Sequence, residues 1–199
     1  MNFRLFSILW WRIYFFVWLM NLEKLFGSKT KVDILKYLLF RRQGVSMRAL
    51  ESELWWTFPA IKKQIDSLEE SWVLQIEKDA NSFSIKIKQN LFSIFKVFFF
   101  DTLKASLEEL FLQYSTHISH YFRGKKFWIN LDMDMIVIFK DDMKDDISWI
   151  KNQISEIFSN YFTDNISIVF MAQSEREKRY RLADRFVLQV MRFYPDIKM

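Results

Sequence analysis

The 199-residue chain has no cysteine and only two histidines, two prolines and three glycines. The lack of cysteine excludes disulfide bonds and thiolate metal sites. His117 and His120 are too few for most catalytic metal centres, so we interpret both as ordinary polar residues. Hydrophobic residues make up 51% of the chain, which excludes a disordered protein. The length allows one large domain or two small ones.

Charge gives a weaker indication of partners. The formal net charge is +5 and the isoelectric point is about 9.3. A moderate positive charge is compatible with a polyanionic partner, but by itself it concerns solubility and steering rather than a particular function.

Glycine is scarce, whereas the chain contains eight tryptophans. Ordinary usage would give about 14 glycines in a chain of this length. Trp55 and Trp56 lie between two helical patterns, and Trp72 follows the end of another. Glycine is favoured at such positions because it adopts positive φ. We therefore hypothesise that the source organism reads UGA as glycine, with tryptophan written by a standard-style translation. Genuine tryptophans in an aromatic-rich sequence from an AT-rich genome are the alternative.

Residues 1–20 form an apolar leader. Arg12 divides it into two short apolar runs, whereas a membrane-spanning helix needs about 20 apolar residues. No small-residue cleavage site follows. We expect a mis-assigned start, with Met20 as the natural first residue; an anchoring amphipathic helix and a signal peptide are the alternatives. We expect the rest of the chain to be cytoplasmic and not to bind membranes.

Residues 21–90 change from a helical to an alternating pattern. Apolar spacing predicts three helices, at about 32–40, 47–54 and 57–71. Ser46 and Thr57 are placed to cap the second and third helices. The period then changes to two, which predicts strands at 73–78 and 82–88 joined by a turn.

Three stretches here resemble the ArsR-like winged helix-turn-helix regulators: LEKLFGSKTKVDILKYLL, MRALESEL and TFPAIKKQIDSLEES-W-VLQIEKD. The match improves if positions 56 and 72 are glycine. The resemblance implies a transcription regulator that binds double-stranded DNA as a homodimer, with the third helix in the major groove. The residues of that helix expected to contact DNA are Thr57, Pro59, Lys62 and Lys63. Those expected to contact the sugar–phosphate backbone of the DNA are Arg48, Lys78, Asn81 and Lys86. The alternative is that these are solvated surface residues.

Residues 91–115 predict one long helix whose first part is apolar on nearly all sides. This apolar surface is typical of a dimerisation helix or of a core helix between two domains.

Residues 116–199 read as strand, strand, helix, strand, helix. We expect strands at 131–139 and 166–171 and a helix at 145–160. Ser174 and Glu177 have the spacing of a capping box for a last helix reaching about Met191.

This half resembles the minimal nucleotidyltransferases of the polymerase-β-like fold. Asp132-Met133-Asp134 matches the family's Asp-x-Asp strand, which implies a Mg²⁺ site. Ser119-His120 stands where the family has Gly-Ser, and Ile166-Ser167-Ile168 lacks the third carboxylate. Asp164 lies near, but its register is wrong for the same site. We expect an inactive relative without a cofactor, which senses an unknown effector or assists assembly.

The sequence thus predicts an α+β protein: a winged helix-turn-helix, a long linking helix and a small α/β nucleotidyltransferase-like domain. We expect a DNA-binding regulator rather than an enzyme. The alternative is a Mg²⁺-dependent nucleotidyltransferase that uses the winged helix as a targeting module. A membrane-tethered regulator using residues 1–20 is a third possibility.

Overall fold

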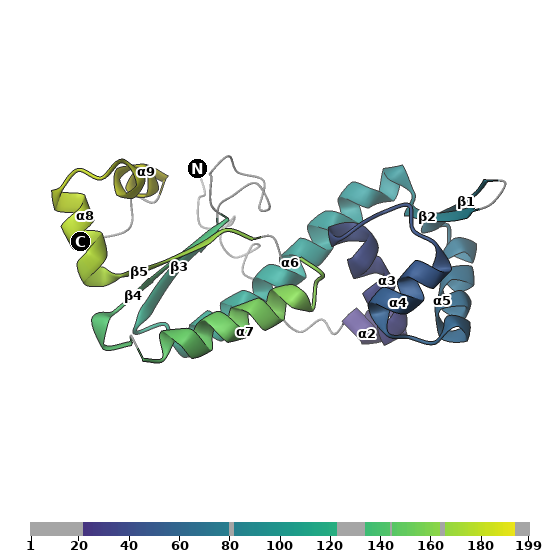
Figure 1. Ribbon diagram of the computed structural model, residues 1–199, viewed down its shortest axis with the longest axis horizontal. Helices are drawn as coiled ribbons and strands as arrows, with labels where there is room; N and C mark the ends of the chain where they lie inside the picture. The colour runs from purple at the N-terminus through teal and green to yellow at the C-terminus, as the bar shows by residue number, and fades with distance from the viewer. Residues whose placement is uncertain (1–21, 80–81, 123–133, 144, 164–165, 194–199) are drawn as a thin grey trace, which may run out of the picture. The chain divides into compact units, whose positions relative to one another are not determined.

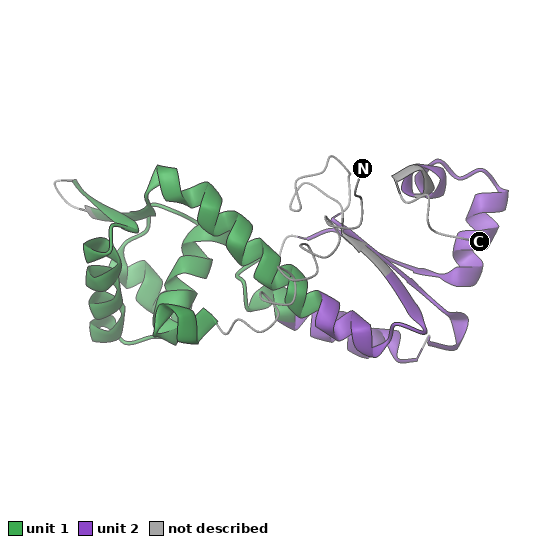
Figure 2. Cartoon of the chain, turned by 180° about the vertical axis from the view of Figure 1, so that it is seen from behind, with its two compact units in different colours: residues 1–107, 157–164 green, residues 108–156, 165–199 purple. Residues whose placement is uncertain are grey.

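The computed structural model describes residues 22–79, 82–122, 134–143, 145–163 and 166–193, so the leader lies outside the described residues. The chain divides into two compact units (Figure 2). Unit 1 comprises residues 1–107 and 157–164, and unit 2 comprises residues 108–156 and 165–199. The described residues form helices and two small sheets, which confirms the α+β class.

The described part of unit 1 begins with four helices joined by short turns (Figure 1). They are α2 (Leu22–Phe26), α3 (Lys29–Phe40), α4 (Met47–Leu54) and α5 (Phe58–Glu70). The hydroxyl of Ser28 accepts a hydrogen bond from the Lys31 amide, and that of Ser46 accepts one from the Ala49 amide. These caps satisfy amides that a helix start leaves without a partner, so α3 and α4 begin where the serines stand.

Helix α5 is capped differently from the sequence expectation. Thr57 is the N-cap residue, but its hydroxyl makes no capping hydrogen bond. The Glu51 carboxylate accepts from the Phe58 amide instead, at 3.1 Å. The predicted buried face is confirmed, because Ile61 and Ile65 have no exposed surface.

The predicted hairpin follows α5. Strands β1 (Leu74–Asp79) and β2 (Ser82–Ile87) pair antiparallel. Ile85 and Ile87 are buried against the helices, whereas Phe83, two residues nearer the turn, is half exposed. A bridge between Val45 and Ile85 joins the hairpin to the segment before α4.

Helix α6 (Gln89–Gln113) confirms the long helix predicted at this position. Its Phe99 and Leu103 are fully buried. Tyr161 and Phe162, which follow α7 (Ile147–Ser159), contribute to the same core of unit 1. The ring contacts are Tyr161 with Phe40, Phe162 with Tyr37, and Phe40 with Phe100, at centroid separations of 5.9, 5.6 and 4.8 Å.

Unit 2 contains a three-stranded sheet of order β3-β4-β5. Its strands are β3 (Ile118–Phe122), β4 (Met135–Phe139) and β5 (Ile168–Ala172). The central strand β4 runs antiparallel to β3 and parallel to β5, and all its residues are buried. Burial on both faces explains why its sequence is a continuous apolar run rather than an alternating one.

The prediction of a single last helix is wrong. Two helices are present, α8 (Gln173–Arg181) and α9 (Arg185–Phe193), and Ala183 between them has a φ of 53°. The capping box is wrong too, because Ala172 is the N-cap residue of α8. The Ser174 hydroxyl instead donates to the Asp141 carboxylate, which also accepts from the Ser174 amide.

Two tryptophans adopt the left-handed backbone that favours glycine. Trp55 ends α4 with a φ of 58°, and Trp72 follows α5 with a φ of 60°. Gly27 and Gly44 have φ values of 72° and 70°. The side chains of Trp55 and Trp72 are 92% and 74% exposed, so their position owes little to packing.

Candidate nucleic-acid interface

The outward face of α5 carries a shallow depression lined by six residues: Pro59, Lys62, Lys63, Asp66, Ser67 and Glu70. Both lysines are exposed, and neither forms an ion pair with any part of the chain that the structure describes. The lysines lie in the first half of the helix and the acids in the second. The positive potential of α5 is therefore concentrated towards its start.

The surface at the start of α5 is apolar and has few free amide donors. Phe58 is 38% exposed and Pro59 is exposed beside it. The Phe58 amide is bonded to Glu51, and the Ile61 amide donates to the Thr57 carbonyl. Pro59 has no N–H group. This helix start therefore offers little to a phosphate group, and the Glu51 carboxylate makes it less favourable still.

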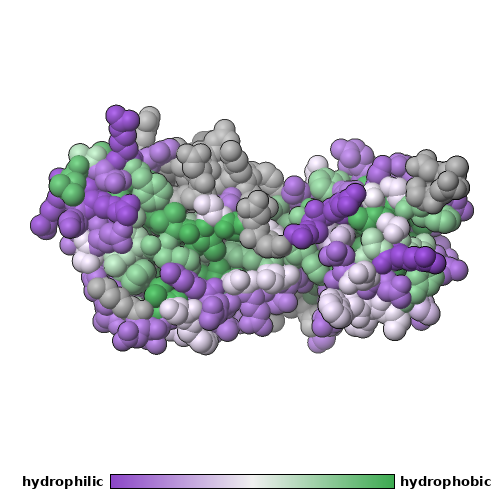
Figure 3. All heavy atoms as spheres, in the orientation of Figure 1, coloured by the Kyte–Doolittle hydropathy of each residue, from purple (hydrophilic) through white to green (hydrophobic). Residues whose placement is uncertain are grey.

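Arg48 lies in the first turn of α4 and is exposed. It forms no ion pair within the described residues, so its guanidinium group is available to an anionic partner. In the view of Figure 3, hydrophilic side chains are interspersed with apolar ones around α4 and α5.

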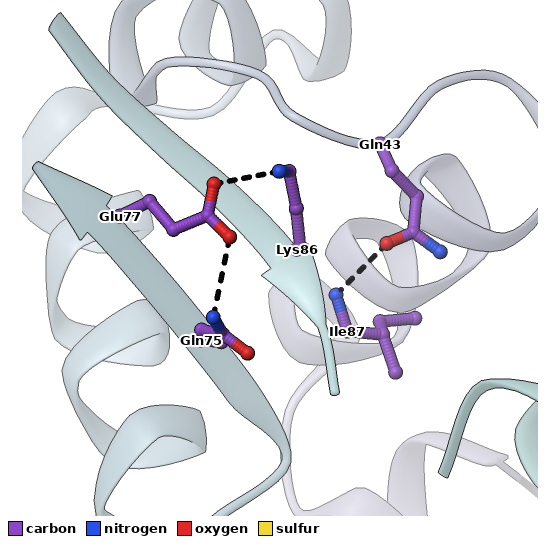
Figure 4. A network of polar contacts seen from close by, with 5 residues as sticks. All are labelled: Gln43, Gln75, Glu77, Lys86 and Ile87. Carbon is purple, nitrogen blue, oxygen red and sulfur yellow. Dashed lines mark hydrogen bonds and ion pairs between the residues drawn. The ribbon is translucent and has the colours of Figure 1, made fainter. Parts of the chain in front are cut away.

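Lys86 of the hairpin is neutralised within the protein. Its Nζ lies 2.6 Å from the Glu77 carboxylate, which also accepts from the Gln75 amide group (Figure 4). Lys86 thus contributes less positive charge to the surface than its sequence position suggests. The Gln43 side chain accepts from the Ile87 amide at 3.1 Å and fixes the base of the hairpin. No local sequence signal indicated this role of Gln43.

The structure places the other charged and polar residues of the hairpin in different surroundings. Lys78 is exposed, with its Nζ 5.8 Å from the centre of the Phe83 ring. Asn81 lies outside the described residues. Lys88, which sequence reasoning did not select, lies with its Nζ 4.0 Å from the centre of the Trp72 ring. The roles predicted for these residues in DNA contact stay predictions.

In unit 2, the candidate carboxylate Asp134 is buried and takes part in the fold. Its Oδ2 accepts from the Ser167 amide at 3.2 Å, and its own amide donates to the Ser167 carbonyl at 2.8 Å. This pair of bonds joins the chain just before β4 to that just before β5. Asp132 and Asp164 lie outside the described residues, as does the side chain of His120. No cluster of three or more His, Asp or Glu side chains suited to a metal occurs in the described ranges.

None of the helices in the described part of the chain combines the length and apolar character that crossing a membrane requires. No protein-family model, curated protein or solved structure matches the chain.

Proposed function

We propose that the protein is a DNA-binding transcription regulator whose unit 1 is an ArsR-like winged helix-turn-helix. The observation that carries the proposal is the outward face of α5, where Lys62 and Lys63 are exposed and form no ion pair within the described residues. Three helices followed by an antiparallel hairpin are the elements that such a module uses. In this arrangement α5 enters the major groove and the two lysines contact phosphates.

The distribution of charge along α5 sets its orientation on a duplex. Asp66, Glu69 and Glu70 in its second half would be repelled by phosphate oxygens, whereas the first half carries the lysines. The start of α5 therefore approaches the bases and its end points out of the groove. Arg48 and Lys78 are the proposed contacts to the DNA backbone. Lys86 is a weaker candidate because it is ion-paired with Glu77.

A homodimer is part of the proposal, with α6 as the dimerisation helix. Ile94 and Val97 lie one turn apart on α6 and are 65% and 44% exposed. Burial of such side chains against a second copy is favourable, and a two-fold dimer would match a two-fold DNA site.

Unit 2 is proposed to be a nucleotidyltransferase-like domain without activity that senses an unknown effector or assists assembly. The use of Asp134 to bind the Ser167 amide supports a structural role for that carboxylate. The alternative function, Mg²⁺-dependent nucleotidyl transfer with unit 1 as a targeting module, rests on the Asp132-Met133-Asp134 motif. It requires that Asp132→Asn with Asp134→Asn abolish Mg²⁺-dependent nucleotide binding and leave DNA affinity unchanged.

The proposal is tested by fluorescence anisotropy with the full chain and a duplex of its own upstream region across a salt series. Affinity should fall with salt, and Lys62→Ala/Lys63→Ala should reduce the slope of log affinity against log salt by about 2, near 0.9 for each lost contact. Lys140→Ala/Lys178→Ala, which removes two exposed lysines of unit 2, is the charge-matched control. Absence of binding at low salt, or equal slopes for the two double variants, would contradict the proposal.

A further inference from the structure

We infer that the start of α5 recognises thymine methyl groups in the major groove, through Phe58 and Pro59 with the adjacent Thr57. The inference rests on the proposed function and specifies the chemistry by which that surface would select its DNA.

The first step is that α5 offers few backbone hydrogen-bond donors at this surface. Of the backbone groups at the helix start, the Phe58 amide is bonded to Glu51, the Ile61 amide is bonded to the Thr57 carbonyl, and Pro59 has no N–H group. Among residues 58–61, the partly buried Ala60 amide is therefore the one donor left without a bond in the described residues. The surface presented there is the half-exposed Phe58 ring and the exposed Pro59 ring. An apolar surface gains by covering another apolar group, and the C5 methyl of thymine is the apolar group of the major groove.

The second step concerns the side chains on the outward face of α5. Bidentate recognition of guanine is made most often by arginine, and that of adenine by asparagine or glutamine. None of these types is among the six residues that line the depression. The Thr57 side chain makes no capping bond, which leaves its methyl and hydroxyl groups available beside Phe58.

The third step identifies the occupant as DNA rather than an apolar protein surface. Lys62 and Lys63 follow Pro59 within one helical turn and are exposed. Their charges complement phosphates that flank a base edge, whereas an apolar protein partner would have to desolvate both ammonium groups.

The experiment compares two duplexes of the same upstream sequence, one prepared with thymine and the other with uracil in its place. Uracil pairs as thymine does but lacks the C5 methyl. Wild-type affinity should fall about fourfold for each contacted methyl that is lost. Phe58→Ser should bind the thymine duplex more weakly and lose most of the difference between the duplexes. Leu182→Ser, which removes an exposed apolar side chain of unit 2, is the matched control and should keep the full difference.

Combining Phe58→Ser with the uracil duplex separates the contact between Phe58 and the methyl group from any effect of uracil on duplex shape. A shape effect would persist in Phe58→Ser, whereas the loss of a methyl contact would not. Salt-dependent binding with equal affinity for both duplexes would overturn the methyl inference and leave the proposed function standing. Failure to bind either duplex at low salt would overturn both. Circular dichroism checks that Phe58→Ser is folded.

A second inference follows independently from the left-handed tryptophans: we infer that positions 55 and 72 are glycine in the protein made by the source organism. Both residues end a helix with positive φ and point into solvent, and glycine is the usual residue at such a position. Trp56 and Trp149 differ: the Trp56 indole donates to Asp33 at 3.0 Å, and Trp149 packs against Tyr114 within α7. The geometry therefore points to reassignment at 55 and 72 and supplies no reason for it at 56 or 149.

Two observations test this second inference. The gene should carry UGA at codons 55 and 72. Tryptic peptides 49–62 and 64–78 of protein isolated from the organism should have the masses expected for glycine at those positions. Tryptophan at both positions in these peptides would overturn it.

Discussion

At the scale of single residues, backbone conformation and helix capping give side chains of the same type different effects on stability. A bulky L-residue in the left-handed region costs about 1–2 kcal/mol because its Cβ approaches the following carbonyl oxygen. Trp55 and Trp72 bear this cost while remaining exposed, whereas Trp149 lies within a helix with ordinary geometry. Trp55 and Trp72 are thus physically distinct from Trp149, although composition alone does not separate them.

Trp55→Gly should raise the free energy of unfolding by about 1 kcal/mol, because glycine adopts positive φ without the steric penalty. Trp72→Gly should gain less, since it also loses the contact with Lys88, worth about 0.5–1 kcal/mol at an exposed site. Trp149→Gly is the control and should lower stability by about 1 kcal/mol or more. Urea unfolding measures all three. Equal losses for Trp55→Gly and Trp149→Gly would contradict the expectation.

Glu51→Ala should have opposite effects on stability and DNA binding. Loss of the bond to the Phe58 amide should cost about 0.5–2 kcal/mol of unfolding free energy. Removal of a negative charge beside the proposed interface should raise the affinity for DNA. Glu53→Ala, at an exposed position of the same helix, should leave stability nearly unchanged. The measurements are urea unfolding and anisotropy; a stability unchanged in Glu51→Ala would show that the cap contributes nothing.

At the scale of elements, the segment after α7 is tied to α6 by a buried polar contact. The Tyr161 hydroxyl donates to Thr102 Oγ1 at 3.1 Å, and Thr102 in turn donates to the Phe99 carbonyl at 2.8 Å. Burial raises the pKa of Tyr161 above its ordinary value, with the Thr102 hydrogen bond opposing the shift in part. Burial therefore favours the neutral phenol.

Tyr161→Phe should lower the free energy of unfolding by about 1 kcal/mol at neutral pH, through loss of one buried hydrogen bond. The pH dependence has a definite sign. The folded pKa exceeds the unfolded value of about 10, so the neutral phenol's contribution is fully present below pH 10. It is lost as pH rises through the folded pKa. Stability of the wild type should therefore fall more steeply than that of Tyr161→Phe above pH 10, as urea titrations at successive pH values would show. Parallel curves would contradict this assignment.

At the scale of the whole molecule, unit 1 is discontinuous in sequence. Residues 157–164 belong to it, and their Tyr161 and Phe162 pack on Phe40 and Tyr37. A DNA-binding module confined to residues 21–90, as the sequence alone predicts, would lack these contacts and most of α6.

In a fragment of residues 22–107, the backbone amides should therefore be less protected from hydrogen exchange than the same amides in the full chain. Hydrogen exchange of the α3 amides should be faster in the fragment, because Phe40 and Tyr37 lose partners from residues 157–164. Helix α5, which makes no aromatic ring contact with that segment among the described residues, serves as the internal reference. Equal α3 protection in fragment and full chain would contradict a stabilising role for residues 157–164.

Local signals in the sequence determined most elements of the described chain. Apolar periodicity located α3, α4 and α5, Ser46 marked the start of α4, and alternation located the hairpin, because these patterns depend on neighbours within a few residues. The continuous apolar run likewise indicated β4. These interactions are short in range, so the sequence alone is sufficient to specify them.

Contacts between distant residues decided the rest. Glu51 rather than Thr57 caps α5, Glu77 neutralises Lys86, and Asp134 binds the Ser167 amide. The supposed capping box at Ser174 was wrong because Asp141, 33 residues away, offers its hydroxyl and amide a carboxylate. A side chain's available charge and hydrogen bonds depend on which partners folding brings near it. The sequence therefore determined where the candidate interface lies, and only the tertiary structure decided which of its side chains remain free to act.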